Sequence, residues 1–86
     1  MTLAKASPSG DEPGRMRKHS LVIAGHSTSI SLEASFWDAL RELARERSLS
    51  VAALVAEIDQ TRGAANLSSA LRVHILQVFR DGAVRK

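Results

Sequence analysis

Histidine and serine are the residue types in this chain that could supply a nucleophile, a base or a metal ligand. The chain contains three histidines and no cysteine. A nucleophile needs a base within hydrogen-bonding reach, and a metal site needs several ligands at fixed spacing. His19, His26 and His74 form no His-x-x-x-His motif, and no glycine-rich phosphate loop occurs. We therefore expect no catalytic residue, no metal site and no cofactor, and the chain is predicted not to be an enzyme.

The serines instead alternate along one predicted strand. Side chains alternate between the two faces of a strand, so Ser27, Ser29 and Ser31 share one face. Ile30 and Leu32 lie on the opposite face, together with a threonine at position 28. A strand with one polar and one apolar face covers a core on its apolar side.

Two amphipathic helices are predicted to follow this strand. Apolar residues recur every three or four positions, which is typical of a helix with one buried face. The first helix is expected to begin near residues 32–34, capped by Ser31, and to end near Arg47. The second is expected to begin after Ser50 and to reach about Thr61. The predicted core and dimer residues are Thr28, Ile30, Leu32, Phe36, Trp37, Leu40, Leu43, Val51, Leu54, Val55 and Ile58.

A third helix is predicted over residues 66–80. Asn66 would cap it and Asp81-Gly82 would end it. Its apolar stripe is wide for so short a helix, so we expect it to pack on the first two helices or across a dimer.

Residues 20–24 are a second strand candidate. Leu21 and Ile23 are odd-numbered, so they would share a face with the apolar residues of the next strand only if the chain turned or bulged between them. A two-residue turn at residues 25–26, pairing Ile23 with Thr28, would achieve this. A hairpin is favoured, and a straight continuation of the strand remains the alternative.

The step Ser31-Leu32-Glu33 is followed by the run FWDALRELARERSLSVAALVAEI, which contains the turn Leu49-Ser50-Val51. On these residues, over Ser27 to Asp59, the chain resembles the ribbon-helix-helix family of small bacterial DNA-binding regulators. TSISLE, FWDAL and NLSSALR are similar to a bacterial subgroup with an additional C-terminal helix. The resemblance implies a mainly α fold with a short β ribbon, in which two chains form an intertwined dimer.

The same resemblance implies a homodimeric transcription regulator, such as a repressor, whose ribbon enters the major groove of double-stranded DNA. Serine discriminates weakly between bases, and the family commonly has Arg, Lys, Asn or Gln at these positions. The positions that would face bases are Ser27, Ser29 and Ser31. Phosphates would be bound by the start of the second helix and by a basic arm, and the residues concerned are Ser50, Val51, Ala52, Arg15, Arg17 and Lys18.

The charge distribution favours an alternative function. Residues 19–63 carry four basic and six acidic residues, whereas residues 64–86 carry four basic residues and one acidic residue. Phosphate neutralisation dominates affinity for DNA, so an acidic middle disfavours strong binding. A hairpin in each chain would also place the outer strands about 14 Å apart, beyond a groove of about 12 Å. The alternative is an antitoxin-like or other protein-interaction module that binds its partner through the helix at residues 66–80.

The chain is expected to form one domain in the cytoplasm. Residues 1–18 are rich in proline, glycine and charge, and are predicted to be a disordered basic leader, with the domain spanning residues 19–86. No apolar run approaches the roughly 20 residues that cross a membrane, and the absence of cysteine is typical of the cytosol.

Overall fold

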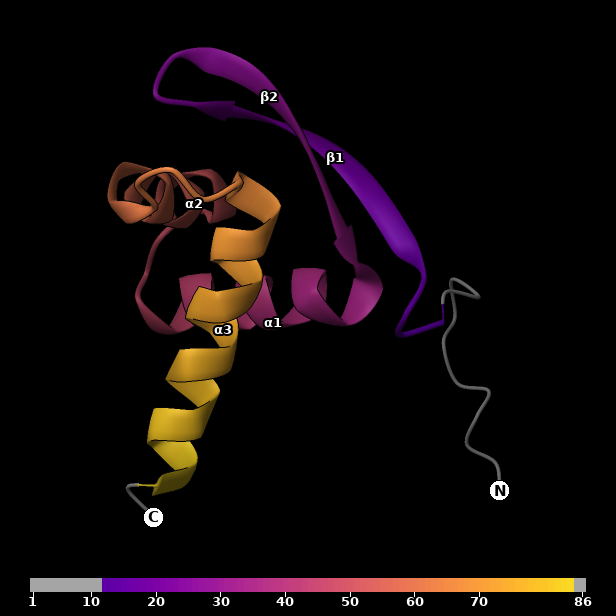
Figure 1. Cartoon of the computed structure of the whole chain (residues 1–86), viewed down its shortest axis with the longest axis vertical. Coiled ribbons are helices and arrows are strands. Elements are labelled where there is room, and N and C mark those ends of the chain that lie inside the picture. Colours follow the sequence, from indigo (N-terminus) through magenta and orange to yellow (C-terminus); the bar gives the residue numbers. More distant parts are fainter. Residues whose placement is uncertain (1–11, 85–86) are drawn as a thin grey trace.

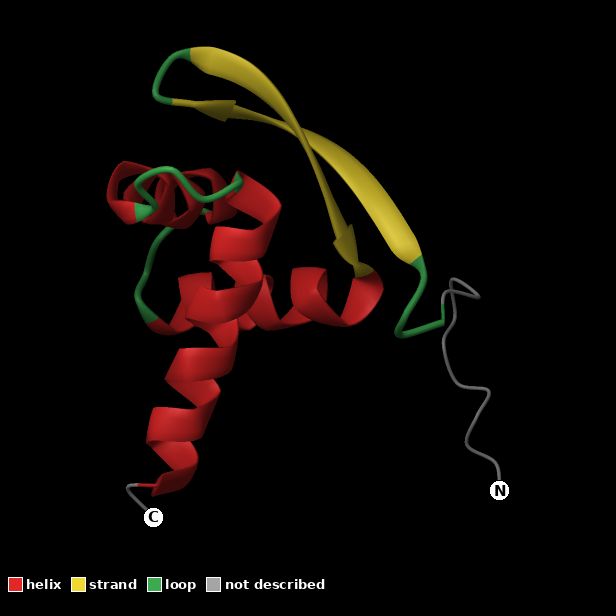
Figure 2. Ribbon diagram, in the orientation of Figure 1, coloured by secondary structure: helices red, strands yellow, loops and turns green. Residues whose placement is uncertain are grey.

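A curved β-hairpin followed by three helices makes up the described part of the chain (Figures 1 and 2). The computed structural model describes residues 12–84. The elements are β1 (Met16–Ile23), β2 (His26–Glu33), α1 (Ala34–Glu46), α2 (Val51–Thr61) and α3 (Leu67–Val84). The strands are antiparallel and lie across one side of the helices, while α3 crosses α1 and extends beyond it (Figure 1). No described helix has the length and apolar character needed to cross a membrane.

The predicted hairpin is confirmed, but its turn lies one residue earlier than expected. Ala24 and Gly25 have φ angles of 51° and 86°, and positive φ at both central residues is typical of a type I′ turn. Ile23 consequently pairs with His26, so the predicted pairing of Ile23 with Thr28 is wrong. Moving the turn by one residue shifts the register by two, and a shift of two leaves every side chain on its predicted face.

The core lies between the inner face of the hairpin and all three helices. Predicted core residues Ile30, Leu32, Trp37, Leu40, Leu43, Leu54, Val55 and Ile58 are buried, whereas Thr28, Phe36 and Val51 are half-buried. The helix α3 adds Leu71 and Ile75 to this core. The third helix is therefore part of the domain and not an appendage to it.

The helix α1 begins at Ala34, within the predicted range, but its cap differs from the prediction. Ser31 lies inside β2 and does not cap the helix, whose N-cap residue Glu33 makes no capping side-chain hydrogen bond. The first amides of a helix need partners outside it. Here the amide of Ala34 donates to the carbonyl of Arg15 at 2.8 Å, and that of Ser35 donates to the carbonyl of Pro13 at 3.0 Å. The chain preceding β1 therefore replaces the expected serine cap.

The predicted caps of the other two helices are confirmed. The side chain of Ser50 accepts from the amide of Ala53, and that of Asn66 accepts from the amide of Ser69, both at 3.0 Å. The expected end of α3 is wrong, because the helix continues through Gly82 to Val84. Glycine costs only about 1 kcal/mol in a helix interior, which does not suffice to stop it here.

The ordered domain begins earlier than residue 19. Met16 to Lys18 form the start of β1, so they do not belong to a disordered leader. The carbonyl of Arg17 also accepts a hydrogen bond of 2.9 Å from Nε1 of Trp37. Of the rest of the predicted leader, residues 12–15 are described and precede β1, and residues 1–11 lie outside the described residues.

Candidate nucleic-acid interface

The outer face of the hairpin carries a row of exposed polar side chains. The strand β1 contributes Lys18 and Ser20, together with the exposed apolar side chains of Met16 and Val22 on the same face, and β2 contributes Ser27 and Ser29. Ser20 pairs directly with Ser29, and their hydroxyl oxygens lie 3.4 Å apart. The sequence prediction identified the two serines of β2 as base-facing and Lys18 as part of a basic arm, but it did not identify Ser20. The signal for Ser20 was its position beside Leu21. If the hairpin turns Leu21 toward the core, the even-numbered residues of the same strand must point outward.

Ser31 does not share this exposure, because the first turns of α3 lie beside the end of β2. The hydroxyl of Ser68 donates to the carbonyl of Ser31 at 3.0 Å. Nε of Arg72 donates to Oε1 of Glu33 at 2.8 Å, and the same guanidinium lies 5.9 Å from the ring centre of Phe36. Ser31 is half-buried as a result. The predicted set of base-facing serines is thus divided, with only Ser27 and Ser29 fully exposed.

The acidic residues of the middle segment lie mainly on the helices, and most of them are paired. Ion pairs in the described part of the chain include Asp38–Arg41 at 3.0 Å, Glu57–Arg47 at 2.9 Å, Asp59–Arg62 at 2.6 Å and Glu33–Arg72 at 2.8 Å. Glu33 is the one carboxylate at the end of the outer face, and its charge is balanced by Arg72. The negative charge that disfavoured DNA binding is therefore largely absent from the hairpin's outer face.

The three cations of the predicted basic arm are separated by the structure. Lys18 is exposed on the outer face, and Arg15 is exposed just before β1. The side chain of Arg17 lies on the other face of β1 from that of Lys18, because neighbouring residues of a strand alternate between its faces. Arg17 is half-buried and lines a cavity of about 80 Å³ together with Trp37 and Asp38. The prediction that Arg17 acts with Lys18 on DNA phosphates therefore conflicts with its position on the helix side of the sheet.

The N-terminus of α2 is the other predicted phosphate contact. The first amides of a helix have no intrahelical partner, and at α2 they belong to Val51 and Ala52. Ser50 accepts from the amide of Ala53 and so satisfies a different donor. Both helical residues are half-buried. A phosphate contact at this position remains a prediction.

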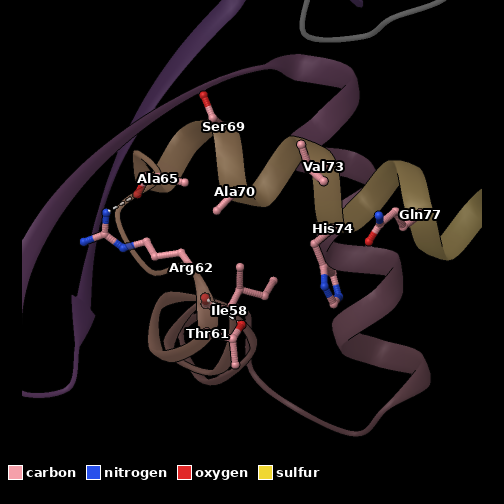
Figure 3. Close-up of a pocket in the computed structure, with 9 residues that line it drawn as sticks. All are labelled: Ile58, Thr61, Arg62, Ala65, Ser69, Ala70, Val73, His74 and Gln77. Carbon is pink, nitrogen blue, oxygen red and sulfur yellow. Dashed lines mark hydrogen bonds between the residues drawn. The ribbon is translucent and has the colours of Figure 1, made fainter.

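A groove of about 300 Å³ separates α2 from α3 (Figure 3). Arg62 lies at one end, where it donates to Oδ1 of Asp59 and to the carbonyl of Ala65, both at 2.6 Å. His74 projects from α3 into the groove, opposite Ile58 of α2 (Figure 3). Among the described residues, no group of three or more His, Cys, Asp or Glu side chains could hold a metal ion.

The contact between α3 and β2 makes a testable prediction about pH. The hydrogen bond from Arg72 lowers the pKa of the Glu33 carboxyl below its ordinary value of 4.5, with help from a backbone hydrogen bond and the charge of Arg72 and against partial burial. A lowered pKa stabilises the folded chain above pH 4.5, and this contribution is lost as the pH falls through the folded-state pKa. Urea unfolding of the parent and of Glu33→Gln should therefore differ at neutral pH and converge in acid.

The control for this prediction is Glu42→Gln, because Glu42 is an exposed carboxylate on α1. It should show no comparable convergence with the parent. Parallel unfolding curves for Glu33→Gln and the parent at every pH would contradict the proposed contribution of the ion pair.

Comparison with known proteins identifies the class to which this fold and face belong. A family model described as a ribbon-helix-helix domain matches residues 16–79, which is most of the chain. The chain therefore belongs to the ribbon-helix-helix domain family.

A particular structure similar to this chain is that of an uncharacterized protein from Bordetella pertussis Tohama I. The two are 37% identical and superpose with a TM-score of 0.68. The match covers 83% of this chain and 62% of the Bordetella chain, so this chain spans less than two thirds of the length of that protein. No curated protein matches.

Proposed function

We propose that this chain is a cytoplasmic, homodimeric transcription regulator that binds double-stranded DNA through the outer face of its hairpin. Membership of the ribbon-helix-helix family supports DNA binding in general. The observation that carries the proposal is the composition of this face. Lys18 and the exposed hydroxyls of Ser20, Ser27 and Ser29 lie on it, and the one adjoining carboxylate, Glu33, is neutralised by Arg72.

The two chains would pair along the free edge of β2. In a two-residue hairpin the residues that flank the turn form a hydrogen-bonded pair, and such pairs recur at every second position. His26, Thr28 and Ile30 therefore direct their backbone groups toward β1. Ser27 and Ser29 direct theirs to the opposite edge, where a second chain can add its own β2.

A hairpin in each chain changes how such a sheet would meet DNA. The outer strands of the resulting four-stranded sheet lie about 14 Å apart, slightly more than the major groove of about 12 Å. The two central strands would then place Ser27 and Ser29 over the groove. Lys18 on each outer strand would lie above the phosphates at its rims. This arrangement favours backbone contacts over base contacts, so binding should depend strongly on salt.

Replacing Lys18 with glutamine tests this arrangement. Each phosphate contact contributes about 0.9 to the slope of log K against log salt, so a dimer that loses two lysines should lose about 1.8. Affinity for a random duplex should fall several-fold at low salt. The measurement is fluorescence anisotropy at about 50 and 200 mM salt. The matched control is Arg80→Gln, which removes one exposed positive charge near the C-terminal end of α3, the end of the helix that points away from the hairpin (Figure 1). Equal losses in both variants, or a parent with no salt-sensitive binding, would rule out the proposed interface.

Replacing Ser29 with alanine should affect selectivity more than affinity. A hydroxyl that reaches base edges contributes to discrimination between sites, whereas the strand pairing uses only the backbone at this position. The affinity ratio between a selected duplex and a random duplex should fall a few-fold in Ser29→Ala. An unchanged ratio would show that Ser29 does not contact bases.

A protein-interaction module with weak or no DNA binding is the second candidate. The observation that favours it is the exposed apolar side chains on α3, which include Val73, Leu76 and Phe79. Co-purification of a stoichiometric protein partner, without a salt-sensitive shift of DNA, would favour this function over the first.

A further inference from the structure

From its seventh residue onward, α3 carries exposed apolar side chains. Val73 and Leu76 are each 53% exposed and Phe79 is 47% exposed, at intervals of three residues along the helix. We call these three residues the α3 stripe. Leu71 and Ile75, on the adjacent face of the same helix, are buried in the core. The last turns of α3 continue past α1 and have no neighbouring helix (Figure 1), whereas Val73 lies nearer the start of α3, at the groove between α2 and α3.

The proposed strand pairing alone would bury little apolar surface. A stable dimer of ordinary size buries about 800 Å² on each chain, with an apolar centre. The residues that direct their backbone to the free edge of β2 are Ser27, Ser29, Ser31 and Glu33, and none has an apolar side chain. The other large exposed apolar residues of the described chain are Met16 and Val22 on the hairpin, and Val78 on α3 beside the stripe. Most of the apolar surface available to a dimer is therefore on α3.

The start of α3 is close to the edge at which the second chain would join. The helix α3 begins beside the end of β2, where Ser68 donates to the carbonyl of Ser31 and Arg72 binds Glu33. These two contacts fix the first turns of α3 against the strand. A second chain that adds its β2 to this edge would consequently lie next to the start of α3, from which the stripe continues. Apolar residues along a projecting helix suit packing against another helix.

We propose that the α3 stripe packs against the α3 stripe of a second copy of this chain, continuing the strand interface into a helical one. This inference rests on the homodimer of the proposed function and identifies the apolar half of its interface. The helix α3 covers the free edge of β2 at Ser31, so strand pairing between two chains is confined to Ser27 and Ser29. A stable dimer therefore needs a second contact between the chains.

Substitution of the stripe provides the first test. The variant Leu76→Ser/Phe79→Ser should weaken the dimer at least about ten-fold in sedimentation equilibrium, while circular dichroism remains that of the folded chain, because both side chains are exposed. The matched control is Val22→Ser, which removes a side chain that is 65% exposed on the hairpin, away from α3. It should leave the dimer unchanged.

Disulfide formation provides the second test. The chain has no cysteine, so a thiol introduced by Leu76→Cys has only its counterpart in the second copy to react with. Mild oxidation of Leu76→Cys should give a covalent dimer, whereas Val22→Cys should stay unlinked. Both experiments use the full chain and no DNA.

The outcomes separate this inference from the function on which it rests. A parent dimer that the stripe substitutions do not weaken, with no Leu76→Cys dimer, would overturn the inference and leave the proposed regulator intact. The same result accompanied by loss of a co-purifying protein would overturn it in favour of a different occupant. A parent that is monomeric at all concentrations tested would overturn both proposals together.

Discussion

Replacement of Trp37 by alanine is expected to leave the protein largely unfolded at room temperature. Trp37 is only 3% exposed, its Nε1 donates to the carbonyl of Arg17 at 2.9 Å, and its ring meets His19 edge-on with centroids 4.5 Å apart. Truncation of a buried aromatic residue costs about 3–5 kcal/mol. Small domains have a total stability of about 5–15 kcal/mol, and a domain of this size belongs near the lower end. The loss is therefore comparable to the whole free energy of unfolding.

Two contributions of Trp37 can be separated by a second variant. Trp37→Phe keeps an aromatic ring but removes the hydrogen bond to Arg17, and it should cost about 1–2 kcal/mol plus a smaller packing loss. Unfolding by urea should be followed by far-ultraviolet circular dichroism, since this is the single tryptophan and its fluorescence is lost in both variants. A Trp37→Ala variant as stable as the parent would show that β1 is not held to α1 through this side chain.

Leu71→Ala should have the second largest effect, and it tests whether α3 is part of the folding unit. Leu71 is 0% exposed, in the core that the hairpin and the other helices form. Leucine-to-alanine changes in such positions cost about 2–5 kcal/mol, because a cavity remains. The free energy of unfolding should therefore fall by about 3 kcal/mol, measured at protein concentrations low enough to exclude association.

The control for this prediction lies on the same helix. Leu76→Ala removes the same atoms and has the same helix propensity change, but the side chain is 53% exposed. At low concentration it should change the free energy of unfolding by less than about 0.5 kcal/mol. Equal effects from the two variants would mean that α3 packs on the other helices through a different face.

The inferred role of α3 connects these predictions to function. Its first turns are held by Ser68 and Arg72, its middle completes the core through Leu71, and its end presents the α3 stripe. One helix would thereby stabilise the subunit and also contribute to the dimer. Truncation after residue 66 should consequently destabilise the fold, and cannot serve to isolate a smaller DNA-binding unit.

Much of the local structure could be predicted from sequence because it depends on near neighbours. The positions of α1 and α2, and the caps formed by Ser50 and Asn66, follow from residues close together in the chain. The two faces of the hairpin were also predicted correctly, because alternation survives a register shift of two. The turn itself was misplaced, since both central residues adopt positive φ and only one of them is glycine.

The sequence by itself determined where apolar residues alternate, as in a strand, and where they recur every three or four positions, as in a helix. This spacing gives the strand-helix-helix order, the third helix and the row of serines on one face of the strand. Only the tertiary structure decided which members of that row are exposed and which cations lie beside them. Ser31 is covered by a residue 37 positions later, Glu33 is neutralised by one 39 positions later, and Trp37 binds a carbonyl 20 positions earlier. These contacts arise when separate elements pack against one another, and periodicity within one element contains no information about them.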